Sequence, residues 1–231
     1  MRVLILCGGR GIRAWPATAD VPKPMLQVAD RPVLHHVMEI YARHGFTDFV
    51  LAAGYRHDVI EAYRDWPSEW TVEVVDTGDE ADTGDRVLAC LDRVGERFFA
   101  TYGDGVGNVD ISALAARHDN HDGGATVTVV PLPSQYGTLV IDEAGKVTEF
   151  REKPVLPDHL INAGFFVFDR DALAGHAGGS LERDILPSLG SRGSLFVYRH
   201  DGFWKSMDTQ KDVSDLDALA RREEPPWLTA L

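Results

Sequence analysis

Apolar runs and amphipathic stretches alternate along the first 130 residues. Residues 3–7 (VLILC) form an apolar run that ends at two glycines, which is typical of a central parallel strand. Residues 33–45 carry apolar positions at helical spacing, and Pro32 and Gly45 suit the two ends of a helix. Further strands are predicted over 48–54, 70–75, 97–104 and 125–132, and further helices over 58–66, 83–95 and 110–124. These repeated βα units predict an α/β fold, a Rossmann-like, mainly parallel sheet flanked by helices.

The pattern changes after Pro131. Residues 136–154 are predicted to form a β-hairpin with its turn at 143–145, where a glycine stands. A strand over 160–169, a helix over 180–190, a pair of strands within 194–209 and an amphipathic final helix follow. We expect one domain over residues 1–231, with a soft division between 1–130 and 131–231.

Composition and charge narrow the possible partners. The net charge of −13 argues against nucleic acid and anionic membrane surfaces, which require a basic face. The apolar runs fall well short of the roughly 20 residues of a membrane helix, and the N-terminus does not resemble a signal peptide, so we expect a cytoplasmic protein. Cys7 and Cys90 are expected to be buried rather than disulfide-bonded. The nine histidines show no zinc pattern; we expect His35 and His36 to pack inside and the pair His118 and His121 to lie on the surface.

A glycine-rich turn, GGRGIR, follows the first predicted strand. Gly8, Gly9 and Gly11 would let backbone N–H groups approach phosphate oxygens closely, and Arg13 adds a planar donor fork suited to phosphate. The turn lacks the third glycine of a dinucleotide fingerprint and the Gly-Lys-Ser/Thr of a Walker loop. Taken alone, this stretch is explained equally well by a tight turn with a surface arginine.

Three further residues lie at positions where phosphate chemistry could use them. Lys23 stands between two prolines, which stiffen its backbone. Asp104 and Asp208 each follow a predicted strand, where a carboxylate could hold Mg²⁺ together with phosphate oxygens. Taken singly, Lys23 could be a surface lysine, and each aspartate could form a turn or cap a helix.

The order of the motifs is more specific than any one of them. The sequence GGxGxR, PKP, VDTGD, TYGDG, FREKP, INAGFF and FWKSMDT resembles the sugar-1-phosphate nucleotidylyltransferases over almost the whole chain. VDTGD, TYGDGV and GFWxxMDTxxD are similar to the branch of glucose-1-phosphate cytidylyltransferases. The resemblance implies a GT-A-like nucleotidyltransferase fold with a nucleotide-binding half and a hairpin-containing sugar-phosphate-binding half.

The resemblance also implies substrates and roles. The substrates would be a nucleoside triphosphate, with CTP favoured, and a sugar 1-phosphate, with glucose 1-phosphate favoured; a homo-oligomer would be compatible with the family. Arg13 and Lys23 would be catalytic, and Mg²⁺ would be held by Asp104 and Asp208. The remaining roles are triphosphate binding by Gly8, Gly9, Gly11, Thr83 and Gly84, and sugar-phosphate binding by Glu152, Lys153 and Asn162.

Departures from the family pattern leave alternatives open. Ile12 stands where the family usually has Thr, Asp85 stands where relatives tend to have Gly, and the stretch 63–72 is short. A uridylyl- or guanylyltransferase acting on another sugar 1-phosphate, such as a heptose, is the main competitor. A non-catalytic sensor of nucleotide or sugar phosphate, and a metal-dependent glycosyltransferase, are further alternatives. The presence of Lys23, Asp104, Lys153 and Asp208 disfavours the sensor.

Overall fold

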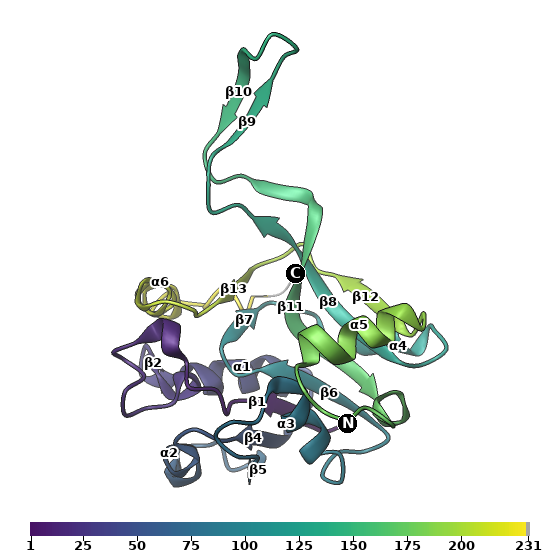
Figure 1. Ribbon diagram of the computed structural model, residues 1–231. Coiled ribbons are helices and arrows are strands. Elements are labelled where there is room, and N and C mark those ends of the chain that lie inside the picture. Colours follow the sequence, from purple (N-terminus) through teal and green to yellow (C-terminus); the bar gives the residue numbers. More distant parts are fainter. Residues whose placement is uncertain (230–231) are drawn as a thin grey trace.

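The computed structural model describes residues 1–229 and is built around one seven-stranded sheet (Figure 1). The strand order is β12-β8-β11-β6-β1-β4-β5. Strands β6, β1, β4 and β5 are mutually parallel, β12 is parallel to β8, and β11 runs antiparallel to both of its neighbours. The sheet is therefore mixed and mainly parallel, as predicted, and strands from both sides of residue 131 contribute to it.

The bounds of the elements follow the predicted alternation. The strands of the main sheet are β1 (Val3–Leu6), β4 (Asp48–Ala53), β5 (Thr71–Asp76), β6 (Arg97–Tyr102), β8 (Ala125–Pro133), β11 (Val155–Asp169) and β12 (Leu195–Arg199). The helices are α1 (Val33–Ala42), α2 (His57–Ala62), α3 (Thr83–Ala89), α4 (Ile111–Asp119), α5 (Leu186–Ser191) and α6 (Gln210–Ala220), with a π-helical turn, η4 (Leu181–Ile185), directly before α5. Short 3₁₀ segments are η1 (Ile12–Ala14), η2 (Lys23–Met25) and η3 (Arg170–Leu173).

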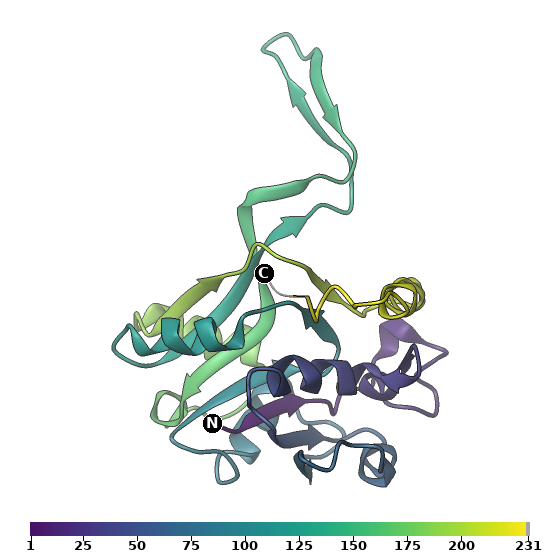
Figure 2. The same ribbon diagram turned by 180° about the vertical axis from the view of Figure 1, so that it is seen from behind.

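Two hydrophobic cores lie on opposite faces of the sheet. Because side chains alternate along a strand, Val3 and Ile5 of β1 enter one core and Leu4 and Leu6 the other. Helices α1, α2 and α4 contribute to the first core, and α3, η4 and α5 to the second. In Figure 1, α3 lies in front of the sheet and α1 behind it; Figure 2, from the opposite side, shows α1 in front. This arrangement leaves the carboxyl ends of β1, β4, β5 and β6 free to carry loops.

The structure corrects some of the predicted ends. Helix α2 stops at Ala62 instead of residue 66, because Tyr63 adopts an extended backbone with ψ of 133°. Helix α3 stops at Ala89 instead of residue 95. His118 is fully buried, with its Nδ1 2.9 Å from the hydroxyl of Thr126, so the expectation of a surface residue was wrong. His35, His36, Cys7 and Cys90 are buried, as expected, and the two cysteines are free thiols.

Three small two-stranded sheets complete the fold. Strand β2 (Gln27–Val28) pairs with β3 (Arg31–Pro32), β7 (Gly105–Gly107) pairs with β13 (Trp204–Ser206), and β9 (Thr138–Ile141) pairs with β10 (Val147–Arg151). The last of these is the predicted hairpin, and it extends away from the body of the molecule (Figure 1). Among the helices of residues 1–229, none has the length and apolar character that crossing a membrane requires.

Candidate active site

The glycine-rich turn leaves β1 at the carboxyl edge of the sheet and runs directly into η1. Gly11 adopts φ of +60°, a left-handed conformation that glycine reaches without strain. A Cβ atom on Gly11 would lie 2.7 Å from the Cβ of Lys23, so only glycine allows this lysine to pass so close. The turn therefore fixes the position of Lys23, and its own backbone N–H groups could in addition contact a ligand.

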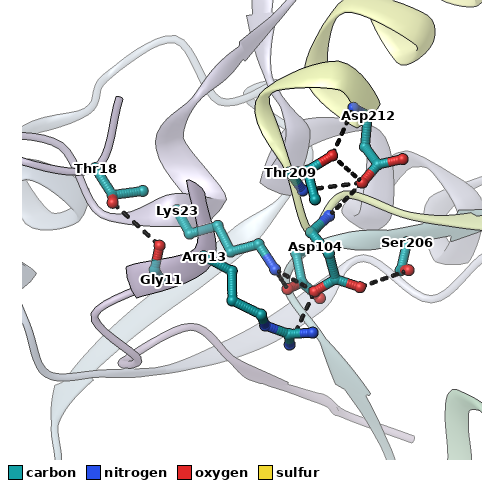
Figure 3. A network of polar contacts seen from close by, with 9 residues as sticks. Gly11, Arg13, Thr18, Lys23, Asp104, Ser206, Thr209 and Asp212 are labelled. Carbon is teal, nitrogen blue, oxygen red and sulfur yellow. Dashed lines mark hydrogen bonds and ion pairs between the residues drawn. The ribbon is translucent and has the colours of Figure 1, made fainter. Parts of the chain in front are cut away.

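Lys23 joins two aspartates that are far apart in the sequence (Figure 3). Its Nζ lies 2.5 Å from Oδ2 of Asp104 and 3.0 Å from Oδ1 of Asp208. The guanidinium of Arg13 also lies 3.0 Å from Oδ1 of Asp208. The side chain of Lys23 is only 10% exposed, whereas that of Arg13 is 77% exposed. We call these four residues the ionic cluster.

The pairing of β7 with β13 brings the two aspartates together. Strand β7 begins directly after Asp104, and β13 ends two residues before Asp208. Gly105 is paired with Ser206, and the amide of Met207 donates to the carbonyl of Asp104 at 2.9 Å. A strand of three residues around Gly105 gives almost no pattern in the sequence, so this pairing was not predicted.

Asp208 faces the ionic cluster rather than capping the final helix. Thr209 is the N-cap of α6 and forms a capping box with Asp212. The Asp208 carboxylate instead contacts Lys23 and Arg13 and accepts a hydrogen bond from the hydroxyl of Ser206 at 2.9 Å. Burial alone would raise the pKa of Asp208, but the charges of Lys23 and Arg13 and the hydrogen bonds lower it below its usual value. Asp208 therefore stays ionised.

The ionic cluster borders a cavity of about 580 Å³. Nine of the residues predicted for the site line it: Gly8, Gly9, Gly11, Arg13, Lys23, Thr83, Asp104, Asn162 and Asp208. These residues come from six separate parts of the chain and meet beyond the carboxyl ends of β1 and β6, where open α/β sheets bind their ligands. A second cavity, of about 360 Å³, lies against Trp227 and contains none of the predicted residues.

Three predicted residues do not line this cavity. Gly84 is buried in the contact between α3 and the segment before η4, where a Cβ would lie 2.6 Å from the carbonyl oxygen of Gly179. Glu152 and Lys153 are exposed and directly follow β10 on the projecting hairpin. Lys153 adopts φ of +44°, an unusual backbone for a lysine. Gly8 does border the cavity, but its carbonyl accepts from Arg86 at 3.1 Å.

Thr83, Tyr102, Asn162 and Glu182 form a second polar group in the wall of the cavity. The carboxylate of Glu182 accepts hydrogen bonds from the hydroxyls of Thr83 and Ser180, at 2.7 and 2.9 Å, and from the hydroxyl of Tyr102. The side-chain amide of Asn162 donates to the same Tyr102 hydroxyl at 3.3 Å. From the sequence, Thr83 was predicted to bind the triphosphate and Asn162 the sugar phosphate, whereas Glu182 and Tyr102 were not predicted. The only signal for Glu182 was its place in a predicted helix.

Arg86 is a third residue of the cavity wall that the sequence did not reveal. Its guanidinium is buried and donates to the carbonyls of Gly8, Ala53 and Gly78 and to the hydroxyl of Thr77, at 2.6–3.1 Å. Within residues 1–229 it forms no ion pair with a carboxylate, and burial lowers its pKa. Arg86 thus ties the turn after β1 to the loops after β4 and β5 and adds positive charge under the cavity.

The departures from the family motif have structural explanations. Asp85 accepts from the amides of Asp82 and Gly179 at 3.1 and 2.8 Å, so it closes a capping box and does not line the cavity. The side chain of Ile12 is 77% exposed and leaves the backbone of the turn undisturbed. Burial raises the pKa of Cys7 to about 12, so the thiol in the cavity wall stays protonated.

The donor set of the cluster fits a hard cation. Carboxylate oxygens are the protein ligands that Mg²⁺ prefers, and Mg²⁺ commonly uses one or two of them together with substrate phosphates. Both carboxylates reach one ammonium group and so converge on one point. The part of the chain that the structure describes contains no group of three or more His, Cys, Asp or Glu side chains able to hold a metal. Asp104 and Asp208 would therefore share a magnesium ion with phosphate oxygens or water.

Cations and carboxylates that meet beyond the carboxyl ends of parallel strands are typical of α/β proteins that bind phosphorylated ligands. The chain belongs to the nucleotidyl transferase family, whose model matches residues 2–214. This confirms the family predicted from the order of the motifs.

Relatives and a solved structure agree with that assignment. The chain is 35% identical over 256 residues to the glucose-1-phosphate cytidylyltransferase of Salmonella typhi, and the match covers 99% of each chain. It is 33% identical over 241 residues to the mannose-1-phosphate guanyltransferase of Kluyveromyces lactis, covering 96% of this chain and 67% of that one. HddC from Yersinia pseudotuberculosis has the same fold, with a TM-score of 0.75 at 23% identity over 94% of this chain and 98% of that one.

Proposed function

We propose that this sugar-1-phosphate nucleotidyltransferase joins CTP and glucose 1-phosphate to give CDP-glucose and pyrophosphate. The observation that carries this proposal is the ionic cluster, in which two cations and two carboxylates meet at the rim of a cavity beside a glycine-rich turn. The preference for CTP and glucose is supported by the relative from Salmonella typhi, which matches over 99% of both chains.

The reaction is an in-line displacement at phosphorus. An oxygen of the sugar phosphate attacks the α-phosphorus of the triphosphate, a new P–O bond forms, and the bond to the pyrophosphate oxygen breaks. The attacking oxygen is already anionic, so no general base is required. The barrier comes from repulsion between two anions and from charge on the phosphoryl oxygens. Lys23 and Arg13 oppose both effects, and the backbone of the turn holds the triphosphate in line.

Asp104 and Asp208 are the residues that would hold Mg²⁺. When bound, the ion neutralises charge on the phosphates and fixes their geometry. The two aspartates supply hard oxygen ligands. The Ser206 hydroxyl donates to the Asp208 carboxylate, and the backbone amide of Asp208 donates to the Asp212 carboxylate, so both contacts keep Asp208 oriented.

Two polar groups line the cavity. One is the ionic cluster with Arg13 and Lys23, and the other is the hydrogen-bonded set of Glu182, Tyr102 and Asn162. We propose that the phosphates lie against Arg13 and Lys23 and that Thr83 faces the base. Glu152 and Lys153 are proposed to bind the sugar phosphate, which requires the hairpin to approach an occupied cavity.

A guanylyltransferase acting on another sugar phosphate is the second candidate. The guanyltransferase of Kluyveromyces lactis matches 96% of this chain and supports it, although this chain spans only 67% of that protein.

Pyrophosphate release separates these possibilities. The protein is incubated with Mg²⁺, each of four nucleoside triphosphates and a panel of sugar 1-phosphates. We expect the fastest release with CTP and glucose 1-phosphate. Release with GTP and a different sugar phosphate would favour the second candidate. If no pair of substrates releases pyrophosphate, both enzymatic proposals are overturned and the non-catalytic sensor becomes the favoured alternative.

A further inference from the structure

The ammonium of Lys23 lies where Asp104 and Asp208 converge. The two contacts, of 2.5 and 3.0 Å, use one oxygen of each carboxylate, and the lysine side chain is 90% buried. Arg13 contacts the same oxygen of Asp208 at 3.0 Å. Two negative charges are thus already matched by two positive charges, so the carboxylates attract a further cation only weakly.

A divalent cation and this ammonium would compete for the same oxygens. Mg²⁺ holds its ligands at about 2.0–2.1 Å, which leaves no room for an ammonium bonded to the same pair of oxygens. Two positive charges so close together would also repel each other strongly in a partly buried site. A cation can bind this pair of oxygens only after the ammonium has moved.

The lysine cannot move as a whole. Its backbone lies in η2 between Pro22 and Pro24, and the stem passes Gly11 with no space for even a Cβ on that residue. The flexible outer part of the side chain can still turn into the cavity, which Lys23 lines. When the side chain rotates in this way, the ammonium leaves the two carboxylates and contacts another anion instead. A polyphosphate is the anion that this cavity is proposed to hold.

We infer that Lys23 is an internal substitute for the divalent cation. The ammonium holds Asp104 and Asp208 until a polyphosphate draws it away, so the cation and the triphosphate enter together and the cation alone binds poorly. This inference rests on the proposed function, because it takes the two aspartates as the metal ligands.

The affinity of the nucleotide-free protein for Mn²⁺ tests this directly. Mn²⁺ serves as a paramagnetic probe, and electron paramagnetic resonance measures the concentration of free Mn²⁺. We expect Lys23→Met to bind Mn²⁺ at least about tenfold more tightly than the wild type, which corresponds to about 1.4 kcal/mol. Adding Asp104→Asn to Lys23→Met should remove the gain.

Lys205→Met is the matched control. Lys205 also bridges two aspartates, Asp212 and Asp215, at 3.0 and 3.2 Å, but it does not line the cavity. Its removal should leave the affinity for Mn²⁺ within twofold of the wild type. An equal gain in Mn²⁺ affinity in Lys23→Met and Lys205→Met would overturn the inference. Removing the lysine from any pair of aspartates would then have the same effect.

Loss of a buried ammonium could unfold the chain, so folding is measured in the same samples. Lys23→Gln keeps a neutral donor at this position and takes the place of Lys23→Met if the latter does not fold. In either variant, Mn²⁺ should raise the melting temperature more than it does in the wild type. Unchanged Mn²⁺ affinity in a folded Lys23 variant overturns the inference. If the wild type still releases pyrophosphate in that case, the proposed function survives.

Discussion

Lys23 is the residue on which the chemistry depends most. Removing one positioned charge from a transition state of this kind costs about 10²–10³ in kcat. We therefore expect Lys23→Ala to lose this much turnover, with the KM for the sugar phosphate changed far less, because Lys23 is proposed to act at the reacting phosphorus. Steady-state kinetics with each substrate varied in turn measures the two effects. Lys205→Ala is the control. An unchanged kcat in Lys23→Ala would rule out the action of Lys23 at the reacting phosphorus.

His35 gives the protein a predictable response to acid. Its ring is buried against Trp66 and Trp70, with centroids 5.9 and 5.0 Å away. A nitrogen of Arg31 lies 3.3 Å from Nε2, and because a guanidinium can only donate, Nε2 must accept and stay unprotonated. Burial, with the nearby charge of Arg31, lowers the pKa of His35 to about 4. Between these two pKa values, the His35 ring is thus neutral in the native state but protonated in the unfolded chain, where its pKa is about 6.5.

The sign of the effect follows from this difference. Stability is lost as the pH falls from about 6.5 to about 4, by up to about 3 kcal/mol, and this contribution stays constant outside that range. His35→Phe keeps an aromatic ring against the tryptophans and should flatten the loss. Urea unfolding between pH 4 and 7 measures it, with the exposed His159→Phe as the control. Equal pH dependence in wild type and His35→Phe would contradict the assignment.

Sequence reasoning found single site residues but not their contacts. Lys23, Asp104 and Asp208 could be named because prolines, glycines and strand ends mark their positions. Arg86 and Glu182 could not, because each reads as a polar residue of a helix until tertiary structure buries the first and surrounds the second with hydroxyls. Hydrogen-bonding partners 33 to 99 residues away are set by packing, which a single sequence does not display.

At the scale of elements, two glycines of the predicted site are expected to behave differently. A Cβ on Gly84 would lie 2.6 Å from the carbonyl oxygen of Gly179 and 2.8 Å from Cδ1 of Ile185, whereas a Cβ on Gly9 would meet nothing within 4 Å. Gly84→Ala should therefore lower the free energy of unfolding by about 1–3 kcal/mol by pushing α3 away from η4. Denaturant unfolding measures this.

Gly9→Ala is the matched comparison. It should leave stability nearly unchanged but place a methyl group where a phosphate would approach the turn. Loss of one hydrogen bond to a charged group costs about 1.5–3 kcal/mol, so the KM for the triphosphate should rise at least about tenfold. If instead Gly84→Ala weakened triphosphate binding without loss of stability, the binding role predicted for Gly84 from the sequence would stand.

The projecting hairpin carries the proposed sugar-phosphate contacts. Lys153 follows β10 near its base, and Lys146 lies in the turn at its tip. We expect Lys153→Ala to raise the KM for the sugar phosphate about tenfold or more through loss of a charge-assisted contact, with little change for the triphosphate. Lys146→Ala on the same hairpin should change neither value. Identical kinetics in Lys153→Ala and wild type would remove Lys153 from the site.

The elements were predicted best where their pattern is long. Strands β1, β4 and β6 are apolar runs bounded by glycine or polar residues, and all three lie where expected. The pairing of β7 with β13 was not predicted, because each strand has only three residues and the two strands lie about 100 positions apart in the sequence. That pairing places Asp208 beside Asp104, so the geometry of the site depends on the element with the weakest sequence signal.

At the scale of the whole molecule, the hairpin is the one part of residues 1–229 that extends away from the two cores (Figures 1 and 2). Leu139 and Ile141 of β9 share one face of the hairpin with Phe150 of β10, and all three are 56–62% exposed. Two strands alone have no layer to cover their apolar faces, and contiguous exposed apolar surface commonly marks an interaction site. We therefore expect copies of this chain to assemble by packing these hairpins against one another.

Light scattering after gel filtration tests this assembly. The monomer mass is 25.5 kDa, and we expect a multiple of it. Leu139→Glu combined with Ile141→Glu places two charges on one side of β9, since residues two apart share a face of a strand. This pair should shift the mass to the monomer value while circular dichroism and the melting transition of the two cores stay close to the wild type. A wild-type protein that elutes as a monomer would refute the assembly without affecting the cavity, because the residues that line it come from the body of this chain.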